Sequence, residues 1–314
     1  MLSEIAIIVP TKNNLKKISF LLTFYNDQNF SGTIYLADSS EKKIFNEISS
    51  LISRNKFVFE IFHINTFGLG VSKSIMKLKK FVHQNYCLQT GDDDYIFLSG
   101  LKKCLNLLKF SKNDIISCGG RGYLLNLNSK KKIFQYSINS LLSNDYMQRV
   151  ERFINLGLCI QWGLTTKSIF FKIWDNEYFY NHNYLGSDFL PSIKLCLLGK
   201  VGFMDDLYII HMLNDTNIDY YLRIRRDFFT IDEKSFKQAN KLCKAVLGSQ
   251  INDIDNIFEI FYFKMLSKKL KYFNNSININ FIKRFGIKVK FLINYFLDRR
   301  KLNSFLDKIN AQNL

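Results

Sequence analysis

The sequence predicts an α/β protein with a Rossmann-type, mixed but mainly parallel sheet flanked by helices, followed by a helical, basic C-terminal extension. Two observations carry this prediction. Over the first 120 of the 314 residues, short apolar β-branched runs alternate with segments of helical length. From Ser235 onward the pattern is helical and rich in Lys and Arg. We therefore expect an α/β domain over residues 1–230 and a helical extension over residues 231–314.

The expected elements of the first domain alternate regularly along the chain. Strands are expected at 5–9, 33–38, 57–62, 86–89 and 114–118, with helices between them at 15–25, 41–54, 71–83 and 97–110. Further on we expect a hairpin of 122–128 with 131–138 that turns at 128–130, a helix at 141–154, a strand at 167–173, a helix at 188–198 and a strand near 207–212. Strands joined by helices form right-handed βαβ units, and such a sheet binds ligands at the carboxyl ends of its strands.

Composition limits the compartment and the class of partner. A net charge of +17 suits nucleic acid, a phosphorylated ligand or an anionic membrane surface. The six cysteines contain no C-x-x-C pair, which argues against a zinc site or a disulfide framework and favours a reducing compartment. No apolar stretch reaches the ~18 residues needed to cross a bilayer, and the N-terminus lacks the basic start of a signal peptide. We expect a cytoplasmic protein.

Three adjacent carboxylates form the strongest local signal. Asp92, Asp93 and Asp94 follow Gly91 directly after the strand expected at 86–89. Adjacent carboxylates repel one another, so a hard cation such as Mg²⁺ or Mn²⁺, bridging to ligand phosphates, is a natural partner for them. The alternative is a solvated acidic turn that caps the next helix, because Asp is a favoured N-cap residue.

Polar residues also follow the other expected strands. The first strand runs into Pro10-Thr11-Lys12-Asn13, where backbone N–H groups and Lys12 could hold a nucleotide. The second ends at Asp38, which could accept hydrogen bonds from a ribose or a base. The third is followed by a glycine-containing loop and Lys73, which could meet phosphate. Four polar strand ends at one sheet edge predict a nucleotide site.

These residues resemble the motifs of family 2-type bacterial glycosyltransferases with a GT-A fold. Residues 7–13 resemble the opening strand and nucleotide loop of that family, Asp38 its nucleotide-binding acid, and the acidic triplet its D-x-D motif. The match extends over residues 4–212 and is clearest over the first 100. It implies a GT-A-like fold, a nucleotide-sugar donor, a Mg²⁺ or Mn²⁺ ion on the diphosphate, and inversion at the anomeric carbon. Asp92 and Asp94 fit D-x-D, whereas Asp93 and Asp94 fit the family's other spacing, so Asp94 is the expected metal ligand in both.

The resemblance also implies a catalytic base and a further metal ligand. An inverting transferase removes a proton from the acceptor hydroxyl, and Asp188 at a helix start matches the family's base, with Ser187 where the family has Glu. The alternative is that Asp188 only caps its helix. His211 matches a histidine that completes the metal site or touches the diphosphate, and its alternative is a packed, hydrogen-bonded core residue. Weaker candidates for phosphate contact are Arg223, Arg225 and Arg226, and for the acceptor pocket Gln161 and Trp162.

The extension concentrates the positive charge. Residues 264–301 hold eleven Lys and Arg against one acid, with aromatic residues between them, a composition typical of helices that lie on anionic lipid. Such a tail would hold the protein at the inner face of the cytoplasmic membrane and would suit a lipid-linked acceptor. The alternative is that its aromatic stripe packs against the α/β domain. Nucleic acid is a poorer partner, because no recognition motif accompanies the charge.

The predicted function is therefore metal-assisted transfer of a sugar from a nucleotide-sugar donor to a glycan or lipid-linked acceptor. One rival is a sugar-phosphate nucleotidyltransferase, which would require a glycine-rich loop after the first strand, where this chain has Pro10-Thr11-Lys12-Asn13. The other is a non-catalytic GT-A-like module that docks on a membrane or a partner, favoured by Ser187 in place of an acid.

Overall fold

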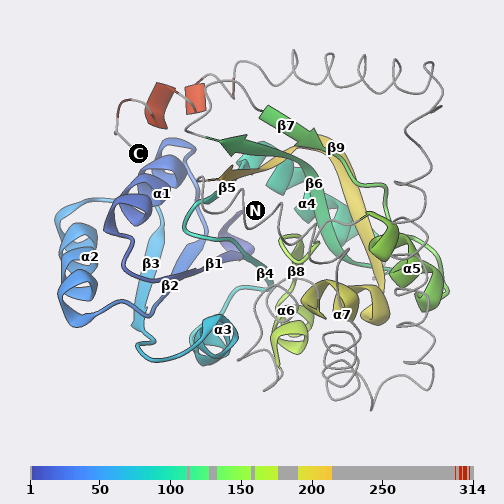
Figure 1. The fold of residues 1–314 in the computed structure, drawn as a ribbon, viewed down its shortest axis with the longest axis horizontal. Helices are drawn as coiled ribbons and strands as arrows, with labels where there is room; N and C mark the ends of the chain where they lie inside the picture. Colours follow the sequence, from blue (N-terminus) through green and yellow to red (C-terminus); the bar gives the residue numbers. More distant parts are fainter. Residues whose placement is uncertain are drawn as a thin grey trace, which may run out of the picture.

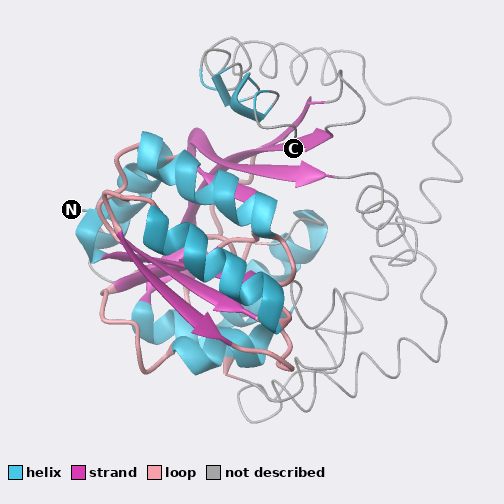
Figure 2. Ribbon diagram, turned by 90° about the vertical axis from the view of Figure 1, so that its left-hand side faces the viewer, coloured by secondary structure: helices cyan, strands magenta, loops and turns pink. Residues whose placement is uncertain are grey.

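The computed structural model describes residues 2–111, 114–126, 133–156, 160–175 and 190–213, together with 301, 304–305, 307–309 and 311. These residues form a sheet with helices on both faces (Figures 1 and 2). The elements in chain order are η1 (Leu2–Glu4), β1 (Ile5–Thr11), α1 (Leu15–Asp27), β2 (Thr33–Asp38), α2 (Lys42–Arg54), β3 (Glu60–Asn65), α3 (Val71–Leu78), β4 (Tyr86–Gln89), β5 (Asp94–Ile96), α4 (Leu98–Phe110), β6 (Ile115–Asn126), β7 (Ile133–Tyr136), α5 (Tyr146–Leu156), β8 (Leu164–Thr166), α6 (Lys167–Trp174), α7 (Leu190–Leu198) and β9 (Lys200–Leu213). No helix among these residues has the length and apolar character needed to cross a membrane.

The sheet has the strand order β3-β2-β1-β4-β8-β6-β9-β5, and β7 pairs with β6 as a ninth strand. The four strands β3, β2, β1 and β4 are parallel to one another. The strand β8 is antiparallel to β4 and β6, β9 runs parallel to β6, and β5 is antiparallel to β9. The longest ladders are parallel, so the predicted mixed, mainly parallel sheet with flanking helices is confirmed.

Two hydrophobic cores lie on opposite faces of the sheet, because successive side chains of a strand point to opposite sides. In β1, Ile5, Ile7 and Val9 join one core while Ala6 and Ile8 join the other. The helices α1, α2 and α4 cover the first face, and α3, α5, α6 and α7 cover the second. The strands β1, β2 and β3 end in Thr11, Asp38 and Asn65, polar residues that belong to neither core.

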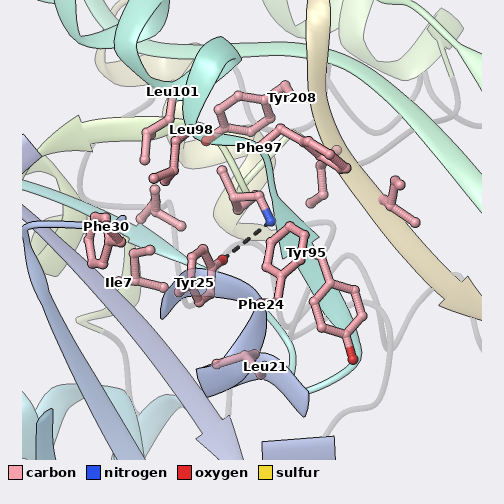
Figure 3. Close-up of a cluster of buried hydrophobic side chains, with 14 of the residues drawn as sticks. Ile7, Leu21, Phe24, Tyr25, Phe30, Tyr95, Phe97, Leu98, Leu101 and Tyr208 are labelled. Carbon is pink, nitrogen blue, oxygen red and sulfur yellow. Dashed lines mark hydrogen bonds between the residues drawn. The ribbon is translucent and has the colours of Figure 1, made fainter. Parts of the chain in front are cut away.

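The first core contains an aromatic cluster around Tyr95, the residue that follows the acidic triplet (Figure 3). Tyr95 packs edge-on against Phe20 and Phe24 of α1, at centroid distances of 5.1 and 5.2 Å. The hydroxyl of buried Tyr25 accepts a 3.2 Å hydrogen bond from the backbone N–H of Ile96. The cluster therefore fixes α1 against β5, the strand that begins with the third aspartate.

Several predicted elements are confirmed and some are wrong. The strand at 86–89 is β4, and β6 pairs antiparallel with β7 from Gly122↔Tyr136 to Leu125↔Ile133, while the predicted turn at 128–130 lies outside the described residues. The strand expected at 167–173 is wrong, since this segment is the helix α6, which buries Phe170, Phe171, Ile173 and Trp174. The apolar side chains of this segment pack against the second face of the sheet. A short run of buried apolar residues fits a helix as well as a strand, so the sequence alone does not distinguish them.

Other boundaries differ for identifiable reasons. The strand expected at 57–62 lies at Glu60–Asn65 and is not fully buried, because it stands at the end of the strand order. The helix expected at 71–83 ends at Leu78, and the one expected at 141–154 begins at Tyr146 because Leu141 pairs with Val201 as a β-bridge. The strand β5 was not predicted.

Candidate active site

The acidic triplet forms a tight turn between β4 and β5 at the carboxyl edge of the sheet. The N–H of Asp94 lies 3.4 Å from the carbonyl oxygen of Gly91, and the Thr90 hydroxyl donates a 2.9 Å hydrogen bond to the Asp94 carbonyl. A Cβ at Gly91 would lie 2.9 Å from a carboxylate oxygen of Asp93, so glycine lets the backbone pass close to the carboxylates. The next helix, α4, has Phe97 as its N-cap, so the alternative that the triplet caps this helix is wrong.

Asp92 joins the turn to the start of α1. Its Oδ2 accepts hydrogen bonds from the Thr11 hydroxyl and the Asn14 side-chain amide, both at 2.7 Å, and its Oδ1 lies 3.8 Å from Lys17 Nζ. Burial raises the pKa of Asp92 above its usual range, although the bonds from Thr11 and Asn14 oppose the shift. Oδ2 of Asp92 is therefore occupied by donors of the protein, while Oδ1 has only the longer contact with Lys17.

Asp93 and Lys17 form an ion pair at the mouth of the turn. Lys17 Nζ lies 2.9 Å from Asp93 Oδ2. Burial and the neighbouring charge of Asp94 raise the pKa of Asp93 to about 6 in spite of this partner. Burial alone would lower the pKa of Lys17, but the attraction of Asp93 and its neighbours raises it. The turn thus contains more negative charge than its lysine neutralises.

Asp94 pairs with His211 across the ladder between β5 and β9. The two residues stand directly opposite each other, and His211 Nδ1 lies 2.7 Å from Asp94 Oδ1. Both side chains are mostly buried. The Trp162 ring contacts the imidazole of His211 at a centroid distance of 4.6 Å, and the Trp162 carbonyl accepts a 2.9 Å bond from the Tyr208 hydroxyl. The sheet therefore brings the expected metal ligands Asp94 and His211 together.

This pair fits a divalent ion better than the other two carboxylates do. Asp94 Oδ1 and His211 Nδ1 are hydrogen-bonded at 2.7 Å, and adjacent ligands of an ion held at ~2.1 Å are roughly 3 Å apart, so an ion bound by both atoms would replace this hydrogen bond with little movement. Among the described residues, no group of three or more His, Cys, Asp or Glu side chains is arranged to hold a metal. Mg²⁺ and Mn²⁺ sites commonly use one or two protein ligands and complete their shell with phosphate oxygens and water. All three aspartates already have partners in the protein, and only the partner of Asp94, His211, is itself a common metal ligand.

Asp38 is fully buried at the end of β2 and fixed by two donors. The Ser40 N–H donates to its Oδ1 at 2.8 Å, and His63 Nε2 lies 2.8 Å from its Oδ2. The Ser49 hydroxyl lies 2.9 Å from His63 Nδ1, and the Phe45 ring stacks on the imidazole at 4.1 Å. Burial alone would raise the pKa of Asp38, but the bonds from His63 and Ser40 outweigh it and hold the pKa below its usual range. Asp38 is thus an ionised, pre-oriented carboxylate.

His63 was not among the residues selected from the sequence. It lies on β3, for which the predicted register was three residues too early. The available signal was a polar His within an apolar run, beside an acid on the neighbouring strand. The parallel pairing of β2 with β3 brings the imidazole to Asp38.

The loop after β1 turns sharply toward this carboxylate. Asn13 has φ 56°, its N–H donates a 2.7 Å bond to the Ser40 hydroxyl, and its side-chain oxygen accepts a 3.0 Å bond from the Glu41 N–H. Pro10 still belongs to β1 and pairs with Ala37, whereas Lys12 is exposed at the loop. The predicted loop therefore adjoins both Asp38 and the acidic turn.

The remaining candidates divide into described and undescribed residues. Lys73 is exposed on α3, and Gln161 is 1% exposed and accepts a 2.9 Å bond from the Ser192 hydroxyl, so it does not face a solvent-filled site. Asp188 and the arginines at 223, 225 and 226 lie outside the described residues, as does the basic stretch from 264 to 300.

No protein-family model matches the chain, and no curated protein matches it. Solved structures do match. The chain is similar to S. aureus TarS 1–349 in complex with UDP-GlcNAc, with a TM-score of 0.55 and 15% identity over 87% of this chain and 76% of that one. For TarS 1–349 alone the TM-score is 0.51, with 16% identity over 88% and 75% of the two chains. Against a further TarS chain, the match has a TM-score of 0.47 and 17% identity, and it covers 79% of this chain and 44% of that one. This chain thus spans less than half of that TarS chain. The likeness to the two TarS 1–349 structures shows that the fold is GT-A-like, as the sequence predicted.

Proposed function

We propose that this chain is a glycosyltransferase that moves a sugar from a nucleotide-sugar donor to a hydroxyl of a glycan or lipid-linked acceptor. The observation that carries the proposal is the pairing of Asp94 with His211 beside two further carboxylates at the carboxyl edge of the sheet. This edge is where an α/β sheet binds its ligands. TarS 1–349, which shares the fold, binds UDP-GlcNAc.

The donor nucleotide would lie across the ends of β1 and β2. Asp38 has no exposed surface here, so its ionised carboxylate would meet the ribose or base only after the groups that cover it move, and the backbone around Asn13 and Ser40 offers polar groups beside it. Both carboxylate oxygens already have one donor, and each can accept a second hydrogen bond. The pre-oriented acid would thus select a ligand that presents N–H or O–H groups.

The diphosphate would lie at the acidic turn, with Mg²⁺ or Mn²⁺ held by Asp94 and His211. When bound, such an ion stabilises the negative charge that develops on the leaving nucleoside diphosphate. Lys17 keeps Asp93 paired and lowers the repulsion between the turn and the phosphates. Trp162, whose ring contacts His211, would adjoin the transferred sugar. Asp188 would remove the acceptor proton, and the reaction would invert the anomeric carbon.

The experiment that tests this proposal is a thermal-shift panel with UDP, GDP, CDP, CMP and ADP, each with and without Mn²⁺. We expect one nucleoside diphosphate to raise the melting temperature only when Mn²⁺ is present. Asp94→Asn should abolish the Mn²⁺-dependent shift. Asp206→Asn, which removes a partly exposed carboxylate paired with Lys103, is the matched control and should keep it. No shift with any nucleotide, or a full shift in Asp94→Asn, would contradict the proposal.

A second function is favoured by Ser187, which stands where the resembled family has an acid. A GT-A-like module that binds without catalysis would show the nucleotide shift but no transfer from the matching nucleotide sugar. Transfer assays with wild type and Asp188→Asn separate the two: an enzyme loses turnover in this variant and keeps the shift.

We also propose that the basic residues between 264 and 301 hold the protein on anionic lipid. Co-sedimentation with phosphatidylglycerol vesicles at low and high salt tests this. Salt-sensitive binding that phosphatidylcholine vesicles do not reproduce is expected, and equal binding to both lipids would contradict it.

A further inference from the structure

Phe305 belongs to the same hydrophobic core as Tyr95, the residue that follows the acidic turn. It lies more than 200 residues after that turn in the chain. Its side chain is 2% exposed. Its ring centroid lies 5.0 Å from that of Tyr95, 5.5 Å from Phe24, 5.8 Å from Phe20 and 6.1 Å from Phe97. The ring therefore contacts α1, β5 and the residue that begins α4, and Figure 1 shows the last part of the chain beside α1.

Neighbouring residues attach the same segment on both sides of the ring. Lys301 Nζ donates a 2.9 Å hydrogen bond to the Ser99 hydroxyl in α4. Lys308 Nζ lies 2.5 Å from Asp27 Oδ2 at the end of α1, and Ile309 is 1% exposed in the same core. These contacts fix the segment against two helices that flank β5, so Phe305 is not a loosely packed surface ring.

The rings that Phe305 contacts belong to the backbone that carries the candidate site. Tyr95 follows Asp94 directly, and the pairing of β5 with β9 sets the distance from Asp94 to His211. Phe20 lies three residues after Lys17 on α1, and Lys17 binds the acidic turn. Phe305 thus contacts two elements that carry site residues: β5, which begins with Asp94, and α1, which carries Lys17.

We propose that Phe305 is a positioning residue, which holds β5 against α1 so that Asp94 stays aligned with His211 for metal and diphosphate. The metal part of this inference rests on the proposed function. Loss of the ring would leave the β5–β9 ladder paired but would remove the contact that holds Tyr95, the residue after Asp94, against α1. Outer-shell residues that orient metal ligands typically change metal affinity by about 10- to 100-fold when they are removed. The effect should therefore appear in metal affinity.

The test uses the full chain with Phe305→Ala and the milder Phe305→Leu. Phe59→Ala is the matched control, because Phe59 is a buried ring of the same core that contacts Phe30 and Phe57 instead of β5. The measurement is the Mn²⁺ concentration that gives half of the nucleotide-dependent thermal shift. We expect an increase of about tenfold for Phe305→Ala and a smaller one for Phe305→Leu. Phe59→Ala should lower the melting temperature without changing the Mn²⁺ requirement. An unchanged requirement in folded Phe305→Leu and Phe305→Ala, or an equal increase in Phe59→Ala, overturns the proposal.

A second readout needs no ligand and separates this inference from the proposed function. The ¹⁵N signals of the His211 ring report its hydrogen bond to Asp94, and His211→Asn assigns them among the four histidines. We expect these signals to move in Phe305→Leu and to stay fixed in Phe59→Ala. If wild type shows no metal-dependent nucleotide shift, the proposed function fails, and unmoved His211 signals in Phe305→Leu would still refute positioning by Phe305.

Discussion

Replacing Asp93 by Asn is expected to stabilise the metal-free protein. Burial and the charge of Asp94 raise the pKa of Asp93 from 3.8 to about 6, although Lys17 pairs with it. Each pKa unit corresponds to about 1.4 kcal/mol, so the ionised carboxylate costs at most about 3 kcal/mol at neutral pH. A quarter of the side chain remains in contact with solvent, which screens part of this cost. We therefore expect Asp93→Asn to raise the free energy of unfolding by about 1–2 kcal/mol at pH 7.

The pH dependence of this gain distinguishes it from ordinary repacking. Folding raises the pKa of this acid, so between about pH 4 and pH 6 the folded state binds more protons than the unfolded state. The unfolding free energy of wild type therefore falls as the pH rises through this window, while that of Asp93→Asn lacks this contribution. Urea denaturation in EDTA at several pH values measures the difference, with Asp206→Asn as the surface control. A variant less stable than wild type at pH 7, or equally stabilised at pH 4 and pH 7, would refute the reasoning.

Three further outcomes follow from particular contacts. Thr11→Val removes a 2.7 Å hydrogen bond to buried Asp92 and should lower the unfolding free energy by about 1.5–3 kcal/mol in urea denaturation; no loss would mean that Asn14 alone suffices. Gly100→Ala would place a methyl group 2.4 Å from a backbone carbonyl of β9, so we expect at least about 1–3 kcal/mol of destabilisation by calorimetry, and a wild-type melting temperature would contradict it. His63→Ala removes a donor that lowers the pKa of Asp38, so it should cost about 1.5–3 kcal/mol at pH 7. The lowered pKa of Asp38 stabilises the folded protein above about pH 4, and this contribution is lost as the pH falls and the carboxylate is protonated. The cost of His63→Ala should therefore shrink below about pH 4, which denaturation curves in the acid range measure.

The sequence predicts the parts of the fold that local pattern determines. The alternation of apolar strands and helices over the first 120 residues predicts a mainly parallel sheet but not the strand order β3-β2-β1-β4, and the pairing of β6 with β7 is predicted by turn residues between apolar runs. It fails at 167–173, where an apolar run fits a strand as well as the helix α6 that forms. A buried segment of eight residues does not show its period, and only the neighbouring elements decide it.

The site divides in the same way. The acidic turn and the loop after β1 can be selected from sequence because each is a short motif at a strand end. The roles of Asp92 and Asp94 cannot, since three identical side chains differ only in what surrounds them: Thr11 and Asn14 for the first, His211 for the third. Phe305 carries no local signal at all. Its importance comes from contacts with residues more than 200 positions away.

The segment around Phe305 also bears on how the chain folds. Lys308 and Asp27 meet across 281 residues, and the four aromatic rings that contact Phe305 among the described residues lie within the first hundred. Contacts of such long sequence separation form late, because the loop must close before they can stabilise anything. During synthesis, part of the apolar surface of Phe20 and Phe24 would therefore stay exposed until the segment around Phe305 has been made. That interval, rather than the finished protein, is where aggregation or chaperone binding would act on this chain.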